Sequence, residues 1–135
     1  GLPLTLIDDA YNANPGSMQA AIERLSGQSC SGRRIAVLGE MAELGSGADN
    51  YHTELAPLLN ASQIDQVFLA GSRYRHCWEQ LDEEKKGAWV DTPDELKPLL
   101  LEALQANDTV LLKGSNSTKV HQLVSWIDQM QQKTA

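Results

Sequence analysis

The sequence predicts an α/β fold in which an open, mostly parallel sheet carries helices on both faces. Short apolar runs alternate with longer segments of helical periodicity along the whole chain, a pattern typical of consecutive strand–helix units. Several runs are rich in Val, Ile and Leu without alternating polar residues, as strands covered on both sides require. The length of 135 residues and the hydrophobic content of 41% suit one domain with one core.

The first strand–helix unit has the clearest boundaries. An apolar run predicts a strand over Leu4–Asp8, and a polar loop of small residues separates it from a helix predicted over Gly16–Ser26. Asn14 is a favoured N-cap residue. Pro15 suits the first helical position because its missing N–H would have no intrahelical partner there.

The remaining elements follow in the same alternation. Further strands are predicted at Arg34–Gly39, Gln66–Ala70, Ala88–Val90 and Thr109–Lys113. Further helices are predicted at Asn50–Ala61, Tyr74–Glu84, Pro93–Ala106 and Thr118–Gln132. At the fourth helix, Thr92 is expected to cap and Glu95 to complete a capping box.

Right-handed crossovers place every strand-to-helix loop at the same edge of a parallel sheet. Four loops should therefore converge, namely Asp8–Pro15, Gly39–Gly47, Gly71–Arg73 and Lys113–Thr118. Ligands of open α/β sheets bind at this edge, so we expect the binding site there.

Composition excludes several functions. A formal net charge of −7 argues against nucleic-acid binding, which needs a concentrated basic face. No apolar stretch reaches the roughly 20 residues that span a bilayer, and Gly1 leads into a strand rather than a signal peptide. We interpret the acidity as favouring solubility in the cytosol, and Gly1 as the start of a piece of a longer protein. Cys30 and Cys77 lack metal-ligand spacing, so we expect reduced thiols and no metal site.

The loop after the first strand contains polar groups suited to a nucleotide. Asp8 and Asp9 could bind ribose hydroxyls or a metal, Asn12 and Asn14 could bind phosphate or base edges, and Tyr11 could stack. The alternative is a capping loop with a solvated aspartate pair. We favour ligand binding, because polar loops at strand carboxyl ends are the usual ligand sites.

The loop Gly39–Gly47 places Glu40 and Glu43 beside apolar residues such as Met41. This composition is compatible with recognition of a small substrate amine, and equally with a long surface loop bearing solvated acids. His52 follows near the start of the next helix, where an exposed histidine is more usual than a catalytic one.

The loop after the fifth strand favours anion binding. Lys113 supplies a cation, Gly114 permits close backbone approach, and Ser115 and Asn116 add donors before a helix. N-capping by Ser115 or Ser117 accounts for part of this pattern. Lys113 ends a core strand, however, so burying its charge requires a partner.

Four stretches together resemble the C-terminal domain of Mur ligases. They are Asp8–Pro15, Val37–Gly45, His52 and Leu112–Ser117, and the resemblance covers essentially the whole chain in the expected order. Tyr-Asn-Ala-Asn at positions 11–14 and Met-Ala-Glu-Leu-Gly at 41–45 favour the type that adds D-alanyl-D-alanine to UDP-N-acetylmuramoyl-tripeptide.

The resemblance implies one domain of a three-domain bacterial cytoplasmic enzyme of peptidoglycan biosynthesis. The absent N-terminal domain would hold the UDP-sugar peptide, and the absent central ATPase domain would bind most of ATP and Mg²⁺. This domain would close over ATP and bring in the dipeptide, whose amine attacks an acyl phosphate. The implied fold is Rossmann-like, with five to six strands, one of them antiparallel.

The resemblance also implies roles for individual residues. ATP would be bound by Asp9, Tyr11, Asn12 and Asn14, and the dipeptide would lie near Glu40, Met41, Glu43, Lys113, Ser115 and Asn116. Two positions depart from the family, which usually has Asp in place of Glu40 and Arg in place of Asn116. The second departure removes a fixed cation and leaves the role of that position open.

The chain has no Gly-x-x-x-x-Gly-Lys-[Ser/Thr] motif, no Gly-x-Gly-x-x-Gly at its first helix and no Gly-x-Ser-x-Gly. We therefore expect no catalytic residue in this fragment, no ATP hydrolysis or ligation by it alone, and at most weak ATP binding.

Two rival functions stay open from the sequence. A phosphoacceptor receiver domain would also have five strand–helix units, an acidic pair after the first strand and a lysine after the fifth. Its acceptor aspartate should end the third strand, where this chain has Ala70 and Gly71. A non-catalytic ligand-binding module is the other alternative, since both the acidic surface and the missing P-loop are compatible with it.

Overall fold

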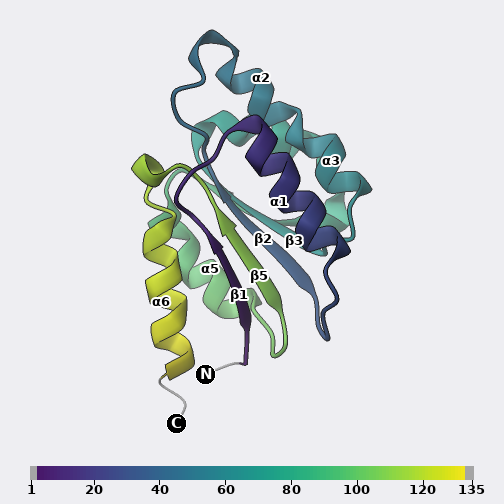
Figure 1. Ribbon diagram of the computed structural model, residues 1–135, viewed down its shortest axis with the longest axis vertical. Coiled ribbons are helices and arrows are strands. Elements are labelled where there is room, and N and C mark those ends of the chain that lie inside the picture. Colours follow the sequence, from purple (N-terminus) through teal and green to yellow (C-terminus); the bar gives the residue numbers. More distant parts are fainter. Residues whose placement is uncertain (1–2, 133–135) are drawn as a thin grey trace.

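Five strands form a single sheet in the computed structural model, which describes residues 3–132, without the side chains of residue 116 and residues 130–132. The strands are β1 (Thr5–Asp9), β2 (Arg34–Gly39), β3 (Gln66–Ala70), β4 (Lys86–Val90) and β5 (Thr109–Lys113). The helices are α1 (Pro15–Gly27), α2 (Ala48–Thr53), α3 (Leu55–Ala61), α4 (Arg75–Gln80), α5 (Leu96–Ala103) and α6 (His121–Gln132) (Figure 1).

The strands lie in the order β1-β5-β2-β3-β4, and every neighbouring pair is parallel. The predicted Rossmann-like α/β fold is confirmed. The antiparallel strand implied by the resemblance is wrong for residues 3–132, because each apolar run there already forms a parallel strand. The order also differs from the 2-1-3-4-5 arrangement of receiver domains, in which the first strand is internal.

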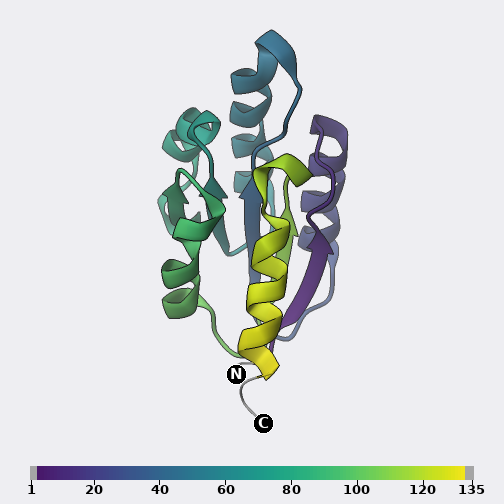
Figure 2. The same ribbon diagram turned by 90° about the vertical axis from the view of Figure 1, so that its left-hand side faces the viewer.

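Helices cover both faces of the sheet, as Figures 1 and 2 show. Residues of α1, α3 and α4 pack on one face, around Met18, Leu59 and Leu69. Residues of α5 and α6 pack on the other, around Leu100 and Leu123. The chain crosses on the first face as it moves from β1 towards β4, then returns to β5 over the second face, as right-handed crossovers require.

The predicted limits of β2, β3 and β5 equal the observed ones, whereas β1 lies one residue later than predicted and β4 begins two residues earlier. One predicted helix is divided, and three are longer than α4, α5 and α6, namely Tyr74–Glu84, Pro93–Ala106 and Thr118–Gln132. The predicted helix Asn50–Ala61 is divided into α2 and α3 by Glu54. Pro57 lies in the first turn of α3, and its missing N–H prevents a continuous helix from bonding back to Thr53. Pro98 lies in the same position of α5, which is preceded by a 3-10 turn.

The two predicted helix caps have different outcomes. At α1 the Asn14 side chain accepts the Ser17 N–H at 2.9 Å, and the Ser17 hydroxyl accepts the Asn14 N–H at 3.0 Å. This reciprocal pair confirms the cap. The capping box predicted at Thr92 is wrong, because its hydroxyl instead donates to the Glu95 carboxylate at 3.1 Å and caps no backbone N–H.

A close approach between β2, β5 and α6 depends on two glycines. A methyl group at Gly39 would overlap the Val120 side chain. A methyl group at Gly114 would lie 3.0 Å from the Gly39 Cα and 2.9 Å from Val120 Cγ2. The absence of side chains at these positions lets α6 begin directly against the strand ends that carry the site.

Gly39→Ala is expected to lower the free energy of unfolding of the 135-residue chain by about 2–3 kcal/mol, because overpacking forces the backbone or Val120 to move. Urea denaturation measures this value. Gly27→Ala is the matched control: its Cβ would meet nothing within 4 Å, so stability should be unchanged or slightly higher. Equal losses in both variants would contradict the packing argument.

Among residues 3–132, no helix is both long and apolar enough to span a membrane.

Candidate functional site

A cleft of about 400 Å³ opens at the carboxyl edge of the sheet. Loops after three strands contribute its walls: the loop after β2, Arg73 after β3, and the turn after β5. Figure 1 shows the loop after β2, together with α2, projecting beyond the strand ends. The lining residues are Glu40, Met41, Ala42, Glu43, Leu44, Gly45, Ala48, Arg73, Ser117 and Thr118.

The topology explains why the cleft lies here. β2 and β5 are neighbours, yet the chain leaves β2 for helices on one face and leaves β5 for α6 on the other. Loops that diverge to opposite faces leave a crevice between them. The predicted convergence of the loops at this edge is therefore confirmed for the three loops that line the cleft. The first loop does not line the cleft but is joined to the neighbouring loops by hydrogen bonds.

Glu40 spans the ends of β2 and β3. Its carboxylate accepts the Arg73 backbone N–H at 2.8 Å. Gly71 has a φ of +128°, and a side chain there would overlap the Glu40 carboxylate. Glycine at 71 is thus needed for both conformation and space, and it lets the Glu40 carboxylate lie against the end of β3 in the wall of the cleft.

Arg73 places a guanidinium among the residues that line the cleft. Its Nη1 lies 3.0 Å from the Asp49 carboxylate, and its side chain is 47% exposed. The sequence alone assigns Arg73 no role. Its position after the third strand, in a loop expected at this edge, is the signal that points to it.

Lys113 does not line the cleft. Its side chain is only 2% exposed, and Nζ donates to the Asp9 carboxylate and to the Asn12 carbonyl, both at 2.9 Å. Asp9 and Lys113 are register partners on neighbouring parallel strands, so their side chains share a face. The partner that a buried lysine requires is therefore Asp9, which is itself 35% exposed.

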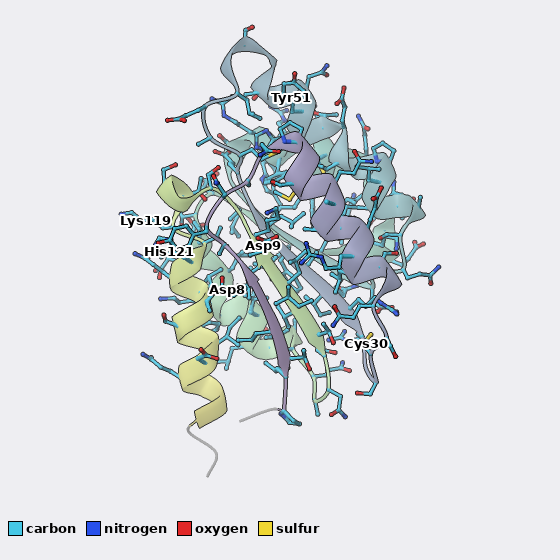
Figure 3. The ribbon with its side chains drawn as sticks, in the orientation of Figure 1. Asp8, Asp9, Cys30, Tyr51, Lys119 and His121 are labelled. Atoms are coloured by element: carbon cyan, nitrogen blue, oxygen red, sulfur yellow. The ribbon has the colours of Figure 1, made fainter. Side chains whose placement is uncertain are left out.

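The first loop leaves Tyr11 and Asn12 exposed, with Tyr11 at 81%. Asp8 and Asp9 project to opposite sides of β1 (Figure 3). The Asp8 carboxylate accepts the Ala10 N–H at 3.2 Å, which shapes the turn. The Asn14 side chain is engaged in capping α1. All four side chains are exposed, but those of Asp8 and Asn14 make local structural contacts, whereas no such contact within residues 3–132 engages the side chains of Tyr11 and Asn12.

Ser115 connects the first loop to the loop after β2, residues 40–47 (the cleft loop). Its hydroxyl accepts the Ala42 N–H at 2.8 Å and donates to the Ala13 carbonyl at 3.3 Å. Its own N–H donates to the Glu40 carbonyl at 3.1 Å. The side chain is buried behind the cleft, whereas the following turn, Asn116–Thr118, reaches it. The side chain of residue 116 lies outside the described part of the structure.

His52 is fully buried beneath the cleft loop, not exposed as its position in the sequence suggested. Nδ1 lies 2.6 Å from the Ala48 carbonyl, which can only accept, so Nδ1 carries the proton. Nε2 accepts the Met41 N–H at 2.9 Å. Burial lowers the pKa of His52, with Arg73 acting in the same direction and the Ala48 carbonyl, Glu40 and Asp49 opposing it.

The lowered pKa of His52 predicts a loss of stability in mild acid. The unfolded chain binds a proton near pH 6.5, whereas the folded chain resists it. The contribution of His52 is therefore complete above about pH 6.5 and declines as the pH falls through the lower folded-state pKa. In urea denaturation at a series of pH values, His52→Gln should flatten this decline. An unchanged slope would contradict the assignment.

Neither a metal centre nor a disulfide forms among residues 3–132. No group of three or more His, Cys, Asp or Glu side chains there could hold a metal ion. Cys30 and Cys77 are both free thiols, and burial raises the pKa of Cys77 to about 12. The cleft therefore offers a guanidinium, carboxylates and backbone groups as its chemistry.

Curated relatives are similar in sequence to this chain over most of its length. UDP-N-acetylmuramoyl-tripeptide–D-alanyl-D-alanine ligase from Bacillus subtilis is 31% identical over 129 residues, which cover 90% of this chain and 27% of the ligase. The ligase of the same name from Escherichia coli is 34% identical, over 88% of this chain and 26% of its own length. This chain thus spans about a quarter of the length of these relatives.

Solved structures and a family model give the same result. The MurF ligase from Thermotoga maritima in complex with ADP matches with a TM-score of 0.77 at 28% identity, over 98% of this chain and 30% of that one. MurF from Acinetobacter baumannii matches with a TM-score of 0.77 at 30% identity, over 93% and 28%. The family described as "Mur ligase, glutamate ligase domain" matches residues 2–116. The chain therefore belongs to the Mur ligase family, of which it represents the glutamate ligase domain.

Proposed function

We propose that this chain is the C-terminal domain of a bacterial cytoplasmic ligase that uses ATP to add D-alanyl-D-alanine to UDP-N-acetylmuramoyl-tripeptide. The observation that carries the proposal is the cleft, whose lining includes one arginine and two glutamates. The first loop, with polar residues suited to a nucleotide, lies beside it. The names of the relatives support the substrate pair.

The chemistry of the cleft matches a small zwitterion. The Arg73 guanidinium would bind the carboxylate of the dipeptide, a pairing that favours two parallel hydrogen bonds. Glu40 and Glu43 would hold the dipeptide amine near the reacting carboxyl group. Met41 and Leu44 offer apolar surface for the methyl groups. A volume of about 400 Å³ lies within the range typical of small-ligand sites.

The buried residues of the predicted site acquire supporting roles in this proposal. Lys113 would hold Asp9 and the Asn12 carbonyl in place, and Ser115 would join the two loops, rather than touch the dipeptide. Asn116 stays a candidate for contact with the dipeptide, because the turn that contains it reaches the cleft. Asn14 would support the nucleotide site by capping α1 and so fixing where that helix begins.

The first loop would complete the nucleotide site. Tyr11 is free to stack on the base or ribose of ATP, with Asp9 and Asn12 beside it. A MurF structure in complex with ADP is among the similar structures. Phosphate and Mg²⁺ would be held by the linked central domain, because this chain has no P-loop and the described residues form no metal cluster.

Residues of this chain would contribute positioning to the reaction. The amine of the bound dipeptide would attack the carbonyl carbon of the tripeptide acyl phosphate, so that the amide bond forms as the bond to the phosphate oxygen breaks, releasing inorganic phosphate and a proton. Holding the amine in line with that carbon accelerates the step by removing translational and rotational freedom. Closure of a separate domain also excludes water from the activated carboxyl group.

Phosphate release by the complete ligase tests this function. It should require ATP, UDP-N-acetylmuramoyl-tripeptide and D-alanyl-D-alanine together, whereas the 135-residue chain alone should release none. Ligation by the isolated chain, or turnover with single amino acids but not with the dipeptide, would overturn the proposal. A stable acyl phosphate formed from a small phosphodonor and Mg²⁺ would favour the receiver alternative, which the strand order already disfavours.

A further inference from the structure

The cleft loop is attached at three successive backbone positions, all of them in residues that line the cleft. The Glu40 carbonyl and the Ala42 N–H both bond to Ser115, on the β5 side. The Met41 N–H bonds to His52 Nε2 at 2.9 Å, on the α2 side. Of these three hydrogen bonds, the one to His52 is the attachment to α2.

The backbone conformation beyond Met41 makes this attachment important for the position of Glu43. Glu43 has a φ of +62° and Gly45 a φ of +71°, so two of three successive residues adopt the left-handed backbone conformation. A non-glycine residue in the left-handed region is costly unless its surroundings hold it there. The position of Glu43 in the cleft thus depends on how firmly Met41 is fixed.

The imidazole of His52 is itself rigidly framed. Nδ1 is fixed by the Ala48 carbonyl, and the ring meets the Tyr74 ring edge-to-face at 4.8 Å between centroids. The Tyr74 hydroxyl donates to the Gly39 carbonyl at 2.7 Å, so the same aromatic ring also supports the end of β2. Tyr51, the neighbouring residue on α2, lies at the outer surface (Figure 3) and leaves the inner side of this helix to His52.

We propose that His52 is the positioning residue of the dipeptide cleft, and that its neutral imidazole holds the Met41 N–H and thereby the Glu43 carboxylate in the binding geometry. This inference rests on the proposed function. Protonation would convert Nε2 from an acceptor into a donor facing another donor, so the attachment would be lost in acid. The charged groups that act on the ring are Glu40 and Asp49, which favour protonation, and Arg73, which opposes it.

Steady-state kinetics of the complete ligase across a pH series test the inference. In the wild type, KM for D-alanyl-D-alanine should rise towards about ten times its neutral-pH value, the worth of one hydrogen bond, as the pH falls below about 6.5 through the lowered pKa of His52. The dipeptide amine titrates equally in every variant, so each KM is compared with that of the wild type at the same pH. His52→Gln keeps an acceptor that does not titrate, so its KM should lack the additional rise in acid. His52→Phe lacks the acceptor, so its KM should already exceed the wild-type value at neutral pH. KM for ATP should not change in either variant.

His76→Gln is the matched control, because His76 is an exposed histidine paired only with Glu79 among the ion pairs of the described residues. Its pH profile should equal that of the wild type. A wild-type profile in His52→Gln, or an unaltered KM in a folded His52→Phe variant, would overturn the inference.

A second readout separates this inference from the proposed function. In the 135-residue chain, the Met41 amide nitrogen and His52 Nε2 should show a ¹⁵N–¹⁵N coupling across their hydrogen bond, which acid abolishes. If the coupling is present but the complete protein does not use D-alanyl-D-alanine, the proposed function fails and the positioning of the loop stands. Absence of the coupling at neutral pH would overturn the positioning role directly.

Discussion

Replacing Arg73 by alanine in the complete ligase is expected to raise KM for D-alanyl-D-alanine about 30- to 100-fold. Hydrogen bonds between charged groups contribute about 2–3 kcal/mol, and each 1.4 kcal/mol corresponds to a factor of ten. Arg73 supplies the guanidinium that lines the cleft, and its only ion-pair partner among the described residues is the exposed Asp49. Initial rates at varied dipeptide concentration measure the change.

Two further variants sharpen this test. Arg73→Lys keeps the charge but loses the planar fork, so it should recover part of the affinity. Arg75→Ala removes an exposed arginine two residues away, on α4 and outside the cleft, and should leave KM unchanged. A wild-type dipeptide KM in Arg73→Ala would show that the carboxylate is bound elsewhere.

Lys113→Met should have the largest effect on stability, lowering the free energy of unfolding by about 3 kcal/mol. Breaking a buried ion pair leaves an uncompensated charge, which usually costs about 3–5 kcal/mol. Partial exposure of Asp9 places the expected value at the lower end. The variant also releases the Asn12 carbonyl, so in the complete ligase KM for ATP should rise more than KM for the dipeptide.

The matched control is Lys97→Met, which removes the surface pair between Lys97 and Asp94 at 2.8 Å. Exposed pairs contribute about 0–1 kcal/mol, so this variant should denature in urea close to the wild type. Equal midpoints for the two lysine variants would contradict the structural role assigned to Lys113.

Strand positions could be read from the sequence because the sheet is buried on both faces. The apolar runs of β2, β3 and β5 are bounded by polar or glycine residues, and their predicted limits equal the observed ones. Helix ends were harder to predict. The breaks near Pro57 and Pro98 depend on backbone hydrogen bonds that the apolar periodicity does not reveal.

The site was predictable at the level of loops but not of every side chain. Glu40, Met41 and Glu43 line the cleft, in line with their place after the second strand. Lys113 and Ser115 lie behind it, because each finds its partners more than 70 residues away in the chain. Arg73 could not be ranked above other surface arginines until the fold placed β3 beside β2.

The central claim is that the cleft of this domain binds D-alanyl-D-alanine, and amide chemical-shift mapping of the 135-residue chain tests it most directly. Titration with the dipeptide should shift the amide signals of Met41–Gly45 and Arg73, and L-alanyl-L-alanine should shift them less. Signals from α5, on the other side of the sheet, should not move. Shifts that map away from the cleft, or equal responses to both dipeptides, would contradict the account.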